Sequence, residues 1–194
     1  MPDRLTMKGL RDAVQCCEGC PLYANATQAV FGEGVLASEV MLVGEQPGDQ
    51  EDRAGAPFVG PAGQVLDRAL DEAGIDRKRT YVTNAVKHFK WKARGTRRIH
   101  DKPTWTEQMA CRPWLEAELA LVKPKALVLM GATAAQTLLG KSFKVTQSRG
   151  VPIESDLAEL VTATIHPSAV LRSDDREAMF AGLVDDLRVV ADRL

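Results

Sequence analysis

Four short runs of apolar and β-branched residues divide the chain. Such runs are typical of strands buried on both faces, and they occupy residues 39–43, 80–84, 125–130 and 160–165. Between and after them, apolar positions recur with the helical period of three to four residues. These helical stretches cover residues 65–73, 104–122, 132–139 and 179–190. Strands that alternate with helices predict a parallel sheet covered by helices on both faces.

Local signals mark the ends of several predicted helices. Thr104 and Glu107 have the spacing of a capping box, which starts a helix running to about Val122, and Pro113 is a point where this helix could divide into two pieces. Gly140 follows residues 132–139 as a helix stop. No repeat, low-complexity stretch or linker interrupts the pattern, so we expect a single domain over residues 1–194.

The composition of the 194 residues is that of an ordinary globular protein, with 45% hydrophobic and 26% charged residues. Disordered and collagen-like classes are therefore excluded. No window reaches the roughly 18 consecutive apolar residues of a membrane span, and no apolar signal core follows the N-terminus. We expect a cytoplasmic, reducing location without membrane contact, in which the four cysteines have a role other than disulfide formation.

Positive charge is concentrated in one segment, residues 87–102, which holds seven basic residues and one acid. Its local charge is +6, whereas the rest of the chain carries −7. Phe89 and Trp91 interleave with the cations, a combination that single-stranded nucleic-acid sites use to hold phosphates and stack bases. A solvated lysine-rich loop is the alternative interpretation. We name residues 87–102 the basic segment.

Polar and glycine-rich turns follow all four predicted strands. In open parallel sheets, ligands bind beyond the carboxyl ends of the strands, so these turns are expected to share one cleft. All three histidines, His88, His100 and His166, lie in such turns or in the basic segment. The turn after the first strand, residues 44–52, lacks both the phosphate-loop lysine and the Gly-x-Gly-x-x-Gly pattern. Phe58 is flanked by Gly and Pro, which could hold its ring at a pocket wall; a core phenylalanine is the alternative.

Three thiols and one histidine form a candidate ligand set. Cys17 and Cys20 have C-x-x-C spacing, Cys111 is distant, and His88 follows the second strand. A Cys₃His set could bind zinc or an iron–sulfur cluster, and spacing alone does not decide between them. Unligated buried cysteines remain an alternative, and a thioredoxin-like pair is disfavoured because the motif precedes the first strand. Cys16 would be the spare thiol.

Seven motifs carry a resemblance to a known family over nearly the whole chain. They are Cys-x-x-Cys-Pro-Leu at 17–22, Gly-Glu-Gln-Pro-Gly at 44–48, Pro-Phe-Val-Gly-Pro-Ala-Gly at 57–63, Asn-Ala-Val-Lys-His at 84–88, Arg-Arg-Ile-His at 97–100, Ala-Cys-Arg-Pro-Trp-Leu at 110–115 and His-Pro-Ser at 166–168. With these motifs the chain resembles the family-4-like uracil-DNA glycosylases and, within them, the X-type branch (UdgX). His88 in place of a cysteine and the Arg-Arg-Ile-His insertion match that branch, whereas Thr96 replaces its usual lysine.

The resemblance implies a three-layer α/β/α sandwich with a central four-stranded parallel sheet. It also implies that Cys17, Cys20, His88 and Cys111 ligate a [4Fe–4S] cluster in a structural role. A uracil flipped out of DNA would stack on Phe58 while the amide of Asn84 reads its edge. The remaining substrate-binding residues that it implies are Gly44, Asp49, Arg98 and Ser168, of which Arg98 would help to hold the basic loop.

The resemblance further implies how the glycosidic bond is broken. His166 would stabilise the charge that builds on the uracil O2. In the X-type branch, the histidine that matches His100 attacks the sugar C1′ and leaves the protein covalently bound to DNA. Glu45 would be its general base, and Gln46 would position water or shape the pocket.

We therefore expect a monomeric enzyme that excises uracil, preferably from single-stranded DNA, and cross-links itself through His100 in a single turnover. The alternative within the class is a multiple-turnover hydrolytic glycosylase of the family-4 type. From other classes, a non-catalytic nucleic-acid binder and an iron–sulfur electron carrier remain as alternatives. Neither of these two roles needs the set of Glu45, Phe58, Asn84 and His166.

Overall fold

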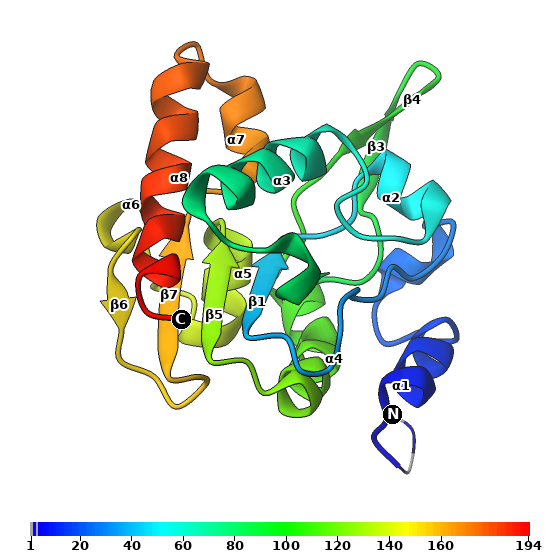
Figure 1. The fold of residues 1–194 in the computed structure, drawn as a ribbon. Helices are drawn as coiled ribbons and strands as arrows, with labels where there is room; N and C mark the ends of the chain where they lie inside the picture. Colours follow the sequence, from blue (N-terminus) through cyan, green and yellow to red (C-terminus); the bar gives the residue numbers. More distant parts are fainter. Residues whose placement is uncertain (1, 3) are drawn as a thin grey trace.

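The centre of the molecule is a five-stranded sheet in the order β2-β1-β5-β7-β6 (Figure 1). The computed structural model describes residue 2 and residues 4–194. The four parallel strands, β1 (Val40–Gly44), β2 (Thr80–Asn84), β5 (Ala126–Met130) and β7 (Leu160–Thr164), confirm the predicted parallel sheet. The additional strand β6 (Pro152–Ile153) pairs antiparallel with β7 at one edge. It has only two residues, too few for a strand pattern in the sequence.

Helices cover both faces of this sheet, as predicted. Leu42 of β1 packs with one group, α3 (Pro61–Ala73) and α8 (Arg176–Ala191), beside α7 (Pro167–Arg172). Its neighbour Met41 points to the other face and packs with the second group, α4 (Trp105–Val122) and α5 (Ala132–Leu139). Figure 1 shows the two helical layers in front of and behind the strands. The smaller helices are α1 (Met7–Val14), α2 (Asp49–Ala54), α6 (Val145–Ser148) and two 3₁₀ turns, Pro21–Ala24 and Arg77–Arg79.

Helix α4 runs unbroken through Pro113, so the predicted division into two pieces is wrong. Its start is fixed by the expected capping box between Thr104 and Glu107. Pro113 is exposed, and at such a position the carbonyl that loses its helical donor can bind water instead. The helix therefore continues through Pro113 without a break.

The basic segment contains a separate antiparallel hairpin, formed by β3 (Trp91–Arg94) and β4 (Arg97–His100). The connection is a two-residue turn in which Gly95 adopts a φ of +60°, a conformation that glycine tolerates best. The hairpin projects from the body of the molecule beside α2 (Figure 1). Over the described part of the chain, no helix is long and apolar enough to cross a membrane.

Candidate active site

The carboxyl ends of the parallel strands border one cavity. Its lining consists of Glu45, Gln46, Gly48, Glu51, Phe58, Ala62, Asn84, His100, His166, Ser168 and Arg172. The turns after β1 and β7 thus meet in one cleft with the last residue of β2, as predicted, whereas residues 85–88 do not line it. The turn after β5 contributes from behind, because Thr133 Oγ1 donates a hydrogen bond of 2.6 Å to Glu45 Oε2.

Phe58 forms a rigid wall of the cavity. Its backbone has a φ of +57°, which is strained for any residue with a side chain. The strain is maintained by close packing, because a Cβ at Gly63 would overlap the carbonyl oxygen of Phe58. The ring lies 6.0 Å from the ring of His166, and the two planes are inclined by 27°. A planar ligand therefore has an aromatic surface on this side.

Asn84 forms the floor of the cavity, and Gly44, predicted as a substrate-binding residue, packs against it without lining the cavity itself. They are register partners at the last positions of β1 and β2, which brings the side chain of Asn84 over the backbone of Gly44. A Cβ at position 44 would overlap Asn84 Oδ1 and would lie 2.7 Å from Phe58 Cζ. Glycine at position 44 thus creates the space between amide and ring. Asn84 is only 3% exposed, so its amide is available to a ligand in the cavity rather than to bulk water.

His166 faces the same floor as a neutral ring. Burial lowers its pKa to about 4, so the imidazole carries no charge at neutral pH. The backbone N–H of Ser168 donates to Nδ1 at 3.2 Å, and Ser168 Oγ lies 2.8 Å from the same atom. A hydrogen bond accepted at Nδ1 assigns the proton to Nε2. Nε2 would lie 3.3 Å from a Cβ at Gly44, so the donor is directed to the cavity floor.

Glu45 and His100 meet at the rim. His100 Nε2 lies 3.1 Å from Glu45 Oε1, and the His100 side chain is half exposed. Burial alone would raise the pKa of Glu45, but hydrogen bonds from His100 and Thr133 outweigh burial and the pKa is lowered. Glu45 is therefore a carboxylate at neutral pH. The arrangement places a proton acceptor beside an imidazole that reaches the cavity from the hairpin.

Gln46 holds the base of the hairpin. Its Nε2 donates to the carbonyls of Lys90 and Asp101 at 3.1 and 3.0 Å, and its Oε1 accepts from the amide of Lys90 at 2.9 Å. The side chain also lines the cavity. Because the amide is fully engaged with backbone, this geometry favours a structural clamp over a water-positioning group.

Arg98 and Asp49, predicted as substrate-binding residues, contact each other outside the described cavity lining. Arg98 Nε lies 2.5 Å from Asp49 Oδ1, and NH1 lies 2.6 Å from Asp52 Oδ2. The guanidinium also lies 5.4 Å and 5.6 Å from the ring centres of Phe89 and Trp91. Both carboxylates belong to α2, so Arg98 anchors the hairpin to that helix.

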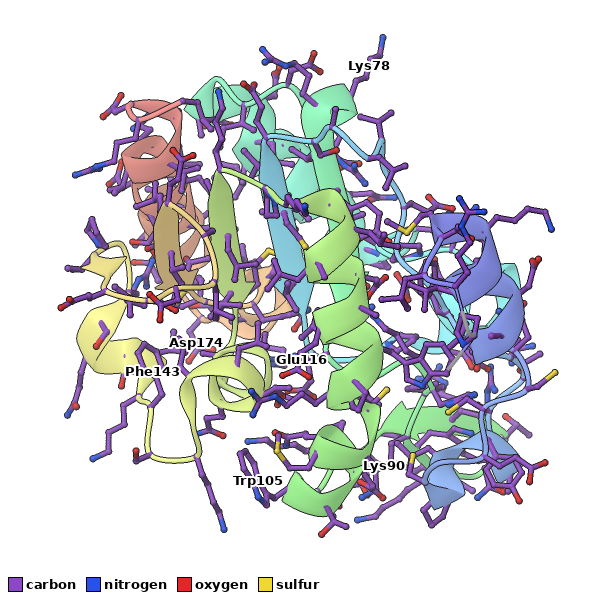
Figure 2. The ribbon with its side chains drawn as sticks, turned by 90° about the horizontal axis from the view of Figure 1, so that it is seen from below. Lys78, Lys90, Trp105, Glu116, Phe143 and Asp174 are labelled. Carbon is purple, nitrogen blue, oxygen red and sulfur yellow. The ribbon has the colours of Figure 1, made fainter. Side chains whose placement is uncertain are left out.

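The charge of the basic segment is smaller than counting residues suggests. Lys87 is buried against Glu118, Lys90 pairs with Glu107 at 3.0 Å, and Arg98 is held by α2. Figure 2 shows Lys90 close to the start of α4, where Trp105 lies. Lys92 is exposed but pairs with Asp101 at 3.0 Å, so the exposed cations without an ion pair among the described residues are Arg94, Arg97 and Lys102. The +6 of the sequence therefore overstates the field at this surface.

Three further residues that the sequence analysis did not single out belong to the site. Glu51 accepts hydrogen bonds from the amides of Gly48 and Gly60 at 3.1 and 2.8 Å, which ties α2 to the loop of Phe58. Arg172 donates to Ser168 Oγ at 2.9 Å. Thr133 fixes Glu45 from the turn after β5. The sequence offered a signal for Thr133, because that turn follows a strand, but none that separated Glu51 from its acidic neighbours.

The predicted ligand residues are only partly brought together. Cys17, Cys20 and Cys111 pack into one cluster with Val86 and Trp114. Cys111 Sγ accepts from the amide of Lys87 and Cys17 Sγ from Trp114 Nε1, each at 3.2 Å. Cys16 is exposed.

Burial affects the cysteine cluster and His88 differently. It raises the pKa of Cys111 to about 12 and lowers the pKa of the buried His88. Within residues 2 and 4–194, no three His, Cys, Asp or Glu side chains converge closely enough to hold a metal ion.

Comparison with known proteins agrees with this fold. Residues 31–188 match the family model of the uracil DNA glycosylase superfamily, so the chain belongs to that superfamily.

Relatives with known names fall in the same class. A type-4 uracil-DNA glycosylase of Thermotoga maritima is 39% identical over 172 residues, covering 88% of this chain and 86% of the relative. A type-4 uracil-DNA glycosylase of Pyrobaculum aerophilum is 34% identical, covering 87% of this chain and 86% of the relative. A type-5 uracil-DNA glycosylase of the same organism is 32% identical and covers 70% of this chain and 63% of the relative.

Proposed function

We propose that the cavity at the carboxyl ends of the sheet binds a uracil flipped out of DNA and that the protein releases this base. The observation that carries the proposal is the convergence of an aromatic ring, a buried amide and a neutral imidazole in one cavity. These groups are Phe58, Asn84 and His166, and they come from three separate segments of a uracil-DNA glycosylase superfamily chain.

Base recognition follows from the floor and wall of the cavity. The flipped base stacks on the ring of Phe58, and the amide of Asn84, with one donor and one acceptor end, matches the O4 and N3–H edge of uracil. Gly44 leaves the space that the base occupies. Because the amide is held at the end of β2, it selects this edge without a costly rearrangement.

Bond cleavage places positive charge on the sugar and negative charge on the departing uracil. The Nε2–H of His166 donates to the uracil O2 as the negative charge builds there. A neutral imidazole serves as a donor without a proton transfer, and the low pKa of His166 keeps the ring neutral. The electron pair of the glycosidic bond leaves with the base, and the sugar becomes a cation at C1′.

A water molecule can then complete the reaction. Glu45, a carboxylate at neutral pH, is placed to accept the proton of a water that attacks C1′. The two type-4 relatives favour this hydrolytic, multiple-turnover course, the alternative of the sequence analysis, over the X-type course.

Covalent capture by His100 is the second candidate, and one contact favours it. His100 borders the cavity and lies 3.1 Å from Glu45, so one ring nitrogen could bond to C1′ while the proton of the imidazole passes to Glu45. No water is consumed, and the enzyme stops after one turnover. Thr96, in place of the usual lysine, lies in the hairpin turn four positions before His100.

We propose single-stranded DNA as the preferred substrate. Arg98 and His100 alternate along β4 with Arg97 and Ile99, so the latter two point away from the body of the protein. Lys92 and Arg94 lie opposite them on β3. This outward face carries Arg94, Arg97 and Lys92, the last paired with Asp101, around the apolar side chain of Ile99, which suits an unpaired strand with accessible bases.

We propose that Cys17, Cys20, His88 and Cys111 hold a [4Fe–4S] cluster. The chemistry of the donor set fits, because three sulfurs share one apolar cluster and two of them accept N–H hydrogen bonds, as cluster-bound sulfurs do. The group would act as a structural tie between the segment before the first strand and α4. Purified protein would then be brown, whereas zinc would leave it colourless.

A denaturing gel tests the proposal. The purified protein is mixed with a labelled single-stranded oligonucleotide containing one uracil, beside a thymine control, and half of each sample is treated with alkali. Free DNA that breaks at the uracil position supports hydrolysis. A uracil-dependent shifted band that disappears in His100→Ala supports covalent capture. Intact DNA in every lane contradicts both and favours the non-catalytic binder.

A further inference from the structure

A buried ion pair lies directly behind the cavity floor, outside the lining residues. Lys87, from the segment after β2, pairs with Glu118 of α4, and both side chains are completely buried. Removing two charges from water is costly, and a buried pair persists only where further hydrogen bonds satisfy both partners. Their contacts therefore indicate what the pair does.

The carboxylate of Glu118 accepts three hydrogen bonds besides the one from Lys87. It accepts from the amide of Gly32 at 3.0 Å, from Tyr81 OH at 2.9 Å and from Thr83 Oγ1 at 3.0 Å. These partners come from the segment before β1 and from β2. These three hydrogen bonds fix the carboxylate independently of Lys87. Glu118 therefore supplies a negative charge of defined position.

The ammonium of Lys87 uses all three of its protons. It donates to Glu118, to Thr83 Oγ1 at 2.7 Å and to the backbone carbonyl of Asn84 at 2.8 Å. The contact with Asn84 is the informative one. It holds the peptide group between Asn84 and Ala85, whose amide in turn donates to the carbonyl of Gly44 at 2.9 Å. The backbone that carries the Asn84 side chain is therefore fixed from both sides.

The same residue is also tied to the thiol cluster. The backbone amide of Lys87 donates to Cys111 Sγ at 3.2 Å, and Cys111 lies two helical turns before Glu118 on α4. Lys87 thus contacts α4 at two points, through its amide and through its side chain. Any shift of α4 against the sheet would act on the carbonyl of Asn84.

We propose that Lys87, with Glu118 as its counter-ion, is the positioning residue for base recognition. Its ammonium holds the carbonyl of Asn84 and thereby sets the side-chain amide at the cavity floor. Lys87 does not touch the base, and it is buried too deeply to contact DNA phosphates, although it belongs to the basic segment. The inference rests on the proposed function, because it assumes that Asn84 reads uracil.

The test removes both charges together, since a single substitution would leave one buried charge unpaired. Lys87→Met/Glu118→Gln keeps acceptors for Gly32 and Tyr81 but leaves the carbonyl of Asn84 without its donor. The probe is a single-stranded oligonucleotide carrying 2′-fluoro-2′-deoxyuridine, which resists cleavage, compared with the same strand carrying thymidine. Dissociation constants for both strands and the melting temperature are measured.

We expect the double variant to lose about tenfold in affinity for the uracil strand, the effect of one hydrogen bond from a charged donor, with unchanged affinity for the thymidine strand. Tyr81→Phe is the matched control: it removes one hydrogen bond from the same carboxylate and leaves Lys87 in place. This variant should lose stability and keep the wild-type preference for uracil. A merely structural pair would reduce uracil preference in both variants in proportion to their lost stability.

The inference is overturned if the double variant keeps the wild-type preference for uracil. A second double variant, Lys87→Met/Glu118→Leu, replaces the pair by apolar side chains, which buried ion pairs often tolerate. It must show the same loss, so the result does not depend on one variant folding well. Wild-type protein that neither prefers nor releases uracil would instead overturn the proposed function itself.

Discussion

His100 Nε2 lies 3.1 Å from Glu45 Oε1, and this contact joins the end of the β3–β4 hairpin to the end of β1. The two residues come from different sheets, the hairpin and the central sheet, yet both line the cavity. The carboxylate is held on its other side by Thr133. A proton acceptor of fixed position therefore stands beside the imidazole, whichever group attacks the sugar.

Replacing Glu45 by glutamine should slow completion of the reaction by about 100-fold, the lower end of what a general base contributes. The amide is nearly isosteric but accepts no proton from water or from His100. Thr133→Val is the matched control, because it removes a hydrogen bond from Glu45 but leaves the carboxylate in place. It should cost much less than Glu45→Gln. Single-turnover kinetics measure both, and equal losses would contradict the role of Glu45 as base.

Stability should fall as the pH decreases from 6.5 to 4 because of His166. The folded pKa is about 4 and the ordinary value is 6.5, so in this interval the unfolded chain binds a proton that the folded protein does not. The stabilisation is fully present above pH 6.5 and declines by about 3 kcal/mol towards pH 4. Thermal unfolding against pH should be flatter in His166→Gln over this interval. Identical curves for the two proteins would contradict the buried, neutral imidazole.

Gly44→Ala should abolish most uracil release while leaving the protein folded. The new methyl group would overlap Asn84 Oδ1 and crowd Phe58, and a displacement of this size at a reacting site can cost about 100-fold in rate. Gly74→Ala is the control variant, because it introduces backbone strain away from the cavity without a steric clash. No atom lies within 4 Å of a Cβ there, but the φ of +78° strains alanine by about 1 kcal/mol. It should lower the melting temperature and keep the activity.

Exposed cations of the hairpin should determine the salt dependence of DNA binding. Each phosphate contact to single-stranded DNA contributes about 0.7 to the slope of log affinity against log salt. Arg94→Ala/Arg97→Ala should therefore reduce that slope by about 1.4. Lys78→Ala is the control, because Lys78 lies at the amino end of β2, far from Lys90 and the cavity (Figure 2). An unchanged slope in the double variant would remove the hairpin from the DNA-binding surface.

The strands and the location of the site could be predicted because both depend on local pattern. Buried parallel strands are continuous apolar runs, and the polar turns that follow them must meet at one edge of the sheet. This reasoning placed Glu45, Gln46 and His166 at one cleft. The family motifs added the roles of Asn84 and His100, which the structure also places at the cavity lining.

The neutralisation of basic side chains by acidic residues distant in the sequence could not be predicted in this way. Counting charges treated Lys87, Lys90 and Arg98 as part of a phosphate-binding strip, but their partners come from α2 and α4. The hairpin was missed for a related reason. Its inward face is held by Arg98 against Asp49 and Asp52 rather than by apolar alternation, so the strand pattern is absent from the sequence.

Measuring free uracil tests most directly whether the cavity that contains Asn84 recognises and releases this base. A single-stranded oligonucleotide with one uracil is incubated with wild-type protein and with Asn84→Ala, and the released base is measured by chromatography beside a thymine strand. We expect wild-type protein to release uracil but no thymine, and Asn84→Ala to release little of either. Wild-type protein that releases no uracil, or a variant as active as wild type, would contradict the site described above.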